Sequence, residues 1–132
     1  MHRLQLTNPI TLCLFCLLMA QDVSHANELE PVLIGLEAEL DACPSLAEIT
    51  TKKPVALFAK PAVGAKTITL LKPKQAVYLC DGSKTAPWVG VVVPDNDKTD
   101  CGVSSNIVKP KPYQGPCKSG WIKQSEFEVT AG

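Results

Sequence analysis

Short apolar runs separated by turn-forming residues dominate the second half of the chain. They lie at residues 55–58, 67–71, 76–80, 88–93 and 120–123, and Phe127 and Val129 follow the last run. Glycine, proline and an Asp-Gly step separate the runs, which is typical of strands joined by tight turns. The run WVGVVV at 88–93 gives the strongest strand signal because it is rich in β-branched residues. The pattern predicts an all-β domain, either a small barrel or a sandwich.

The first part of the chain has a different pattern. Leu33, Leu36 and Leu40 recur near helical spacing, and Pro31 suits a first helical turn. We therefore expect a short helix over residues 32–40. This helix would belong to an acidic N-terminal arm, residues 27–50, which precedes a β domain spanning residues 51–132.

Charge is segregated along the sequence. Residues 27–50 contain six acidic residues and no lysine, and residues 51–76 contain six lysines and no acidic residue. One interpretation is that the acidic arm lies across a lysine-bearing sheet face, where exposed ion pairs contribute little. The other is that the lysines form a binding face for an anionic partner. The sequence leaves both open.

Residues 1–26 have the three-part pattern of a secretory signal peptide. A basic start at His2 and Arg3 precedes an uncharged apolar run at 10–20, and small residues occupy the signal-peptidase positions at Ser24 and Ala26. We expect cleavage after Ala26 and a periplasmic or secreted product. The apolar run is short for a membrane span, which needs about 20 residues. We therefore expect no stable membrane span after processing, and a retained anchor is the alternative.

Four cysteines remain after this cleavage, and no two have the C-x-x-C spacing of a zinc site. In an oxidising compartment they predict two disulfides, for which three pairings are possible. We favour Cys43–Cys80 and Cys101–Cys117. The second pair would clamp the base of a long proline-rich loop, residues 94–119. Loops of this length in compact domains are functional or disordered, and the cysteines argue against disorder.

The residue types available restrict the chemistry. Residues 27–132 contain no histidine and no arginine, which excludes serine–histidine and cysteine–histidine nucleophiles and histidine metal ligation. Formal net charge is zero, so we expect no nucleic-acid partner. The acidic run at Asp95, Asp97 and Asp100 lacks the glycine and distal glutamate of a calcium loop and predicts a polar turn. We expect no enzymatic activity, no cofactor and no metal.

Aromatic residues are the remaining candidates for ligand or partner contact, because tyrosine and tryptophan combine apolar area with a polar tip. We select Tyr78, Trp88, Tyr113 and Trp121. Tyr113 lies in the proline-rich loop, where we expect it to be exposed. For Trp121, packing in a small core is an equally good interpretation.

Three segments together resemble the bacterial SH3-like (SH3b) family. They are residues 56–79, with two strands and their turns, the Trp-led strand 88–93, and the closing segment GWIKQSEF at 120–127. A glycine usual in the hairpin of this family is replaced here by Lys74 or Gln75. The resemblance implies an SH3-like barrel over residues 51–132 and binding of cell-wall peptides.

Together these observations predict a non-catalytic exported binding module. Its partner would be a cell-envelope component, such as a cell-wall peptide in peptidoglycan, or a periplasmic protein. The alternative is a periplasmic inhibitor or immunity protein that blocks an envelope-targeting enzyme. In that case the loop 94–119 would enter the active site of the target.

Overall fold

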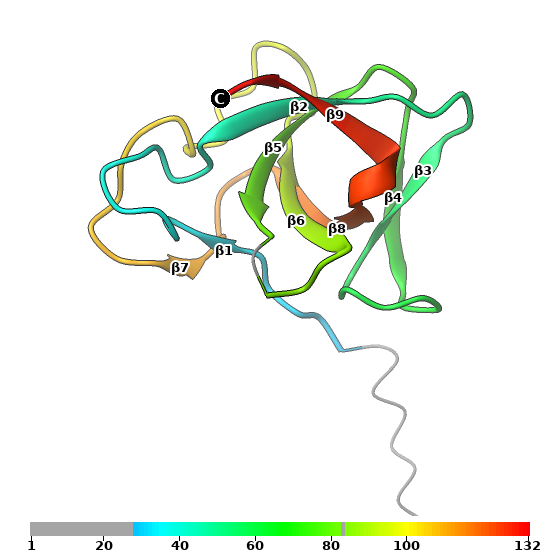
Figure 1. The fold of residues 1–132 in the computed structure, drawn as a ribbon, viewed down its shortest axis with the longest axis horizontal. Coiled ribbons are helices and arrows are strands. Elements are labelled where there is room, and N and C mark those ends of the chain that lie inside the picture. The colour runs from blue at the N-terminus through cyan, green and yellow to red at the C-terminus, as the bar shows by residue number, and fades with distance from the viewer. Residues whose placement is uncertain (1–27, 83) are drawn as a thin grey trace, which may run out of the picture.

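The described part of the chain is all-β, and its nine strands form two sheets (Figure 1). The structure, a computed structural model, describes residues 28–82 and 84–132. The predicted signal peptide and its cleavage site lie outside the described residues. A small antiparallel sheet pairs β1 (Leu33–Ile34) with β7 (Lys111–Pro112).

The main sheet is antiparallel throughout, with strand order β4-β3-β8-β6-β5-β2-β9. The two sheets of the protein are not closed into a barrel. β3 meets β8 through the single pair Phe58–Trp121, where Gly120 leaves room for the carbonyl of Phe58. The strands are β2 (Ser45–Ile49), β3 (Val55–Phe58), β4 (Thr67–Leu71), β5 (Ala76–Asp81), β6 (Trp88–Val93), β8 (Lys118–Lys123) and β9 (Phe127–Ala131).

The five strands expected from the apolar runs are all present, and Phe127 and Val129 form a further strand, β9. The structure adds β2, which lies in the acidic segment expected to be an arm. β2 pairs with β5 on one side and β9 on the other. Its buried residues are Ala47 and Ile49, which alternate with the half-buried Glu48. Two buried positions in five residues gave too weak a signal to predict a strand.

The predicted helix over residues 32–40 is wrong. Leu33 belongs to β1, and Leu36 and Leu40 are exposed in the turn that follows. Gly35 has a φ of 75°, which no right-handed helix accommodates. The described residues contain no α-helix, and their helical element is a 3-10 turn between β8 and β9, Gln124–Glu126.

Strand β6 divides the interior into two cores. All six of its residues are buried, which explains its strong apolar signal. Trp88 and Val92 face a first core, which also holds the four cysteines of the two disulfides, Tyr113 and Trp121. Val89, Val91 and Val93 face a second core, which is aliphatic except for Phe127 and is built with β2, β3, β4, β5, β8 and β9.

Both favoured disulfides are confirmed. Cys43 and Cys80 are joined with a sulfur–sulfur distance of 2.08 Å, and Cys101 and Cys117 with 2.03 Å. Two disulfides in a small domain fit an oxidising environment outside the cytosol. Among residues 28–82 and 84–132, no helix is long and apolar enough to cross a membrane.

Candidate binding site

The four aromatic residues selected from the sequence gather in or against the first core. Trp88, Tyr113 and Trp121 are buried, and the half-buried Tyr78 packs against them. The ring of Phe58 meets Trp88 edge to face with 5.6 Å between centroids. The ammonium of Lys123 lies 5.4 Å from the centroid of the Trp88 ring, within cation–π range.

Trp121 has its polar tip engaged inside the protein. Its side chain is 1% exposed, and its Nε1–H donates to the Glu30 carbonyl at 2.9 Å. This bond ties the N-terminal segment across the first core. None of Tyr78, Trp88, Tyr113 and Trp121 lines the three surface hollows that we describe below.

The expectation that Tyr113 is exposed is wrong. Its side chain is 9% exposed, and its hydroxyl donates to the Cys101 carbonyl at 2.8 Å and accepts from the Cys117 N–H at 3.1 Å. Tyr113 therefore joins both ends of the disulfide-clamped loop from within. Burial raises the pKa of the Tyr113 hydroxyl above its ordinary value, opposed by the bond from Cys117, and the charge of Asp100 raises that pKa further.

This pKa shift predicts a loss of stability in alkali. Unfolded Tyr113 ionises near its ordinary pKa of about 10, whereas the folded hydroxyl keeps its proton to higher pH. Its contribution is therefore complete below about pH 10 and is lost as pH rises toward the folded value. In urea denaturation, Tyr113→Phe should show a smaller fall in unfolding free energy than the parent protein above about pH 10. An equal fall in the two proteins would contradict the assignment.

One surface hollow, which we call the hairpin groove, lies between the β4–β5 turn and the start of the long loop. Its volume is about 580 Å³. Side chains from β2, β4, β5, β6, the loop and β8 contribute to it. Its lining residues are Glu48, Thr69, Leu70, Lys72, Pro73, Lys74, Gln75, Ala76, Val93, Pro94, Asp95, Asn96, Asp97 and Lys118.

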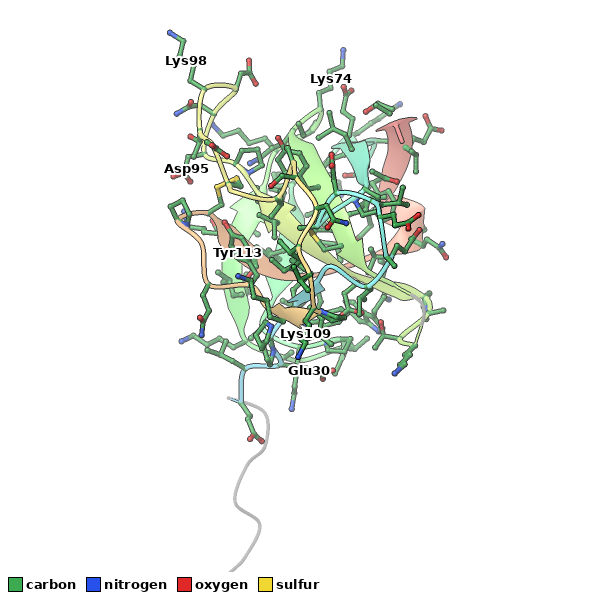
Figure 2. The ribbon with its side chains drawn as sticks, turned by 90° about the vertical axis from the view of Figure 1, so that its left-hand side faces the viewer. Glu30, Lys74, Asp95, Lys98, Lys109 and Tyr113 are labelled. Atoms are coloured by element: carbon green, nitrogen blue, oxygen red, sulfur yellow. A yellow bond between two sulfur atoms is a disulfide. The ribbon has the colours of Figure 1, made fainter. Side chains whose placement is uncertain are left out.

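The hairpin groove carries charges of both signs. Three ammonium groups and three carboxylates line it. Figure 2 shows Lys74 at the same end of the molecule as the loop that carries Asp95 and Lys98. One pair is formed within the groove, with Lys118 Nζ 3.7 Å from Asp95 Oδ1, and both side chains are more than half exposed. Such an exposed ion pair contributes little to stability. Because little free energy is lost when it opens, its two charged groups are available to a ligand. The charged lining is Lys72, Lys74 and Lys118 with Glu48, Asp95 and Asp97.

Two hydrogen bonds fix the backbone of the β4–β5 turn at Lys72 and Lys74. The Lys74 N–H donates to the Ile49 carbonyl at 2.8 Å, and the Lys72 N–H donates to Gln75 Oε1 at 2.8 Å. Lys74 has a φ of 66°, a left-handed conformation that favours glycine. This is the turn in which the sequence substitutes lysine for a glycine expected from the family resemblance.

The opposite wall of the groove is the polar turn predicted from the acidic run. Asn96 Oδ1 accepts from the Lys98 N–H at 2.9 Å, and Asp100 Oδ1 accepts from the Gly102 N–H at 2.8 Å. These bonds shape the turn and leave the carboxylates of Asp95 and Asp97 at its surface. In the described parts of the chain, no histidine, cysteine, aspartate and glutamate side chains gather in a group of three or more suited to a metal ion.

Sequence reasoning identified both walls of this groove separately but not their proximity. The lysine block was one of two interpretations of the charge pattern, and the acidic run was assigned to a turn. The antiparallel pairing of β5 with β6 brings the two together, because the β4–β5 turn and the end of β6 then lie at the same end of the sheet. No protein family, characterised protein or solved structure shows a significant match to this chain.

Proposed function

We propose that this protein is a non-catalytic exported binding module and that the hairpin groove takes a cell-wall peptide. The observation that carries the proposal is that lysines and aspartates line one groove, where Lys118 Nζ lies 3.7 Å from Asp95 Oδ1. Short cell-wall peptides carry both free amino and free carboxyl groups. A groove with both signs of charge complements such a ligand, whereas a groove of one sign would repel half of it.

The strained turn supports a binding role for Lys74. A non-glycine residue in the left-handed region costs on the order of 1 kcal/mol, and such costs concentrate at functional positions. Lys74 lies at the groove and its turn is fixed by backbone hydrogen bonds. The backbone of this turn is thus fixed before a ligand arrives, and only the exposed side chain of Lys74 would lose freedom on binding.

Strand topology and compartment also favour the proposal. The segments that resemble the SH3b family form β3, β4, β5, β6, β8 and the first residue of β9, all in one antiparallel sheet. Two disulfides and the predicted signal peptide fit export to the cell envelope. Residues 28–132 contain no histidine or arginine, which favours binding over catalysis.

The test is co-sedimentation of the purified protein with isolated peptidoglycan sacculi, followed by titration with soluble cell-wall peptides. The double variant Lys72→Glu/Lys74→Glu should weaken binding by about tenfold, because each exposed ion pair is worth up to about 1 kcal/mol. Lys74→Gly should also weaken binding while raising the unfolding free energy by up to about 1 kcal/mol, since glycine relieves the strained φ.

The matched control is Lys52→Glu/Lys53→Glu, which makes the same change in charge at exposed positions outside the groove. This variant should bind like the parent protein. Equal losses in the two double variants would indicate an unspecific charge effect and would contradict the assignment of the groove. Failure of the parent protein to bind either sacculi or soluble peptides would overturn the proposed function.

A second candidate function, inhibition of an envelope-targeting enzyme, is favoured by one observation on the long loop. Val108 is 95% exposed, while the loop around it is fixed to the N-terminal segment. The Ala42 N–H donates to the Ser105 carbonyl at 2.8 Å, and Asn106 Nδ2 donates to the Leu40 carbonyl at 3.0 Å. A preformed apolar tip is suited to insertion into a target. In this case, a stoichiometric enzyme complex would depend on Val108 and would be insensitive to Lys72→Glu/Lys74→Glu.

A further inference from the structure

A second surface, which we call the acidic groove, has a composition different from that of the hairpin groove. It consists of two hollows of about 480 and 320 Å³ that share Glu37, Pro44 and Ser45. The turn 36–41 forms one wall, and β9 contributes to the other. Among residues 28–82 and 84–132, no lysine or arginine lines either hollow.

The floor of the acidic groove is formed by side chains that also pack against the second core. Leu79 and Phe127 pack with that core and also line the groove. Val129 is 59% exposed and Leu36 is 39% exposed at its edges. Apolar side chains that remain in contact with both core and solvent provide area for a partner to cover.

The rim of this groove is negatively charged. Glu37, Glu39 and Asp41 line it, all three are exposed, and none forms an ion pair within the described parts of the chain. Glu39 has a φ of 69°, so it is the second charged residue held in the left-handed region. The lysine side chains of the hairpin groove line a different hollow and do not neutralise this rim.

Strand β9, which contributes Phe127 and Val129 to the groove, has an open backbone edge on the side away from β2. Among the described strands it pairs only with β2, and it is the last strand in the order of the sheet. An edge strand presents N–H and C=O groups to which an extended segment can pair. Thr130 uses its side-chain hydroxyl to bond the Leu46 carbonyl at 3.2 Å, which fixes the end of β9 against β2.

We propose that the acidic groove docks an extended segment of another protein in which apolar side chains alternate with lysine or arginine. The apolar side chains would cover Leu79 and Val129, and the cationic groups would lie beside Glu37 and Glu39. Charge complementarity selects this occupant, because an anionic segment or surface would meet the carboxylate rim without a compensating cation. The inference does not depend on the proposed function, which uses the hairpin groove.

The test uses three fluorescently labelled short peptides with the full processed protein. One alternates lysine with valine, one alternates glutamate with valine, and one alternates lysine with serine. Fluorescence anisotropy should show binding of the lysine–valine peptide that weakens as salt is added, because exposed charges are screened. The other two peptides should bind at least about tenfold more weakly, as expected if both charge and apolar contact contribute. Equal binding of all three would overturn the proposal.

Substitutions locate the interaction. Glu37→Lys/Glu39→Lys should reduce affinity for the lysine–valine peptide by about tenfold or more, and Val129→Asp should do the same by charging the apolar floor. Asp95→Lys/Asp97→Lys makes the same change in charge in the hairpin groove and should leave the affinity unchanged. Backbone amide shifts in NMR spectra should change at Leu36, Ser45 and Val129 on addition of the peptide.

Three results would overturn the proposal. The first is no detectable binding of the lysine–valine peptide by a parent protein that NMR shows to be folded. The second is amide shifts confined to the hairpin groove. The third is self-association of the protein, abolished by Glu37→Lys/Glu39→Lys and unaffected by the peptide, since the occupant would then be a second copy of this chain.

Discussion

Replacing Trp121 by alanine should lower the free energy of unfolding by about 3–5 kcal/mol, the cost of removing a large buried aromatic side chain. The Trp121 side chain is 1% exposed and packs in the first core. It also pairs with Phe58 across the junction of β3 and β8 and holds the Glu30 carbonyl through Nε1. The total free energy of unfolding of a small domain is only about 5–15 kcal/mol, so a large fraction of the stability depends on this residue.

Urea denaturation with both disulfides intact measures this effect, with circular dichroism as the readout. Trp121→Phe keeps much of the ring contact and removes the hydrogen bond, so it should cost less than the alanine variant. Val63→Ala is the control because Val63 is 82% exposed, and its effect should lie within about 0.5 kcal/mol. A loss below about 1 kcal/mol in Trp121→Ala would contradict the assignment of this residue to the core.

Removing the Cys43–Cys80 disulfide should lower the free energy of unfolding by about 4 kcal/mol, and removing Cys101–Cys117 should lower it by about 3 kcal/mol. These values follow from the model in which a disulfide stabilises a protein by closing a loop in the unfolded chain. The difference arises because the first bridge spans 37 residues and the second spans 16. The longer closed loop restricts the unfolded chain more. Alanine should replace both cysteines of a pair, because the cysteines are buried and serine would add a buried hydroxyl.

Denaturation measures which disulfide contributes more to the free energy of unfolding. The two variants compared are Cys43→Ala/Cys80→Ala and Cys101→Ala/Cys117→Ala. In the second variant the hydroxyl of Tyr113 still joins residues 101 and 117 through their backbone groups. The two ends of the loop should therefore stay together. The decrease in the free energy of unfolding should be about 3 kcal/mol or less, the value from the loop-closure model. A greater loss in the second variant than in the first would show that native contacts, rather than restriction of the unfolded chain, determine the contribution of these bridges.

The two grooves give the molecule two surfaces of different chemistry. The hairpin groove combines lysines and carboxylates, whereas the acidic groove combines an apolar floor with a negative rim. In each, one charged residue occupies a left-handed backbone conformation, Lys74 in the first and Glu39 in the second. Each binding experiment has its own control variant outside the groove that it tests, so each proposal fails or stands independently of the other.

The sequence by itself determined the strands that carry dense apolar runs, and it favoured, among three possible pairings of the cysteines, the one that the structure has. Strand β6 was predictable because both of its faces are buried, so every residue contributes to the signal. The family resemblance stays a prediction. The helix over residues 32–40 was wrong because leucine spacing alone does not report a backbone φ such as that of Gly35.

Only the tertiary structure decided which side chains face a core and which face a groove. Tyr113 lies in a proline-rich polar segment, yet two backbone groups of the disulfide loop bind its hydroxyl and bury it. β2 has a weak local signal and forms because β5 and β9 provide partners on both sides. Lys74 and Asp95 are distant in sequence and line the same groove because β5 pairs with β6. Burial and long-range proximity depend on contacts between segments, and local composition does not contain that information.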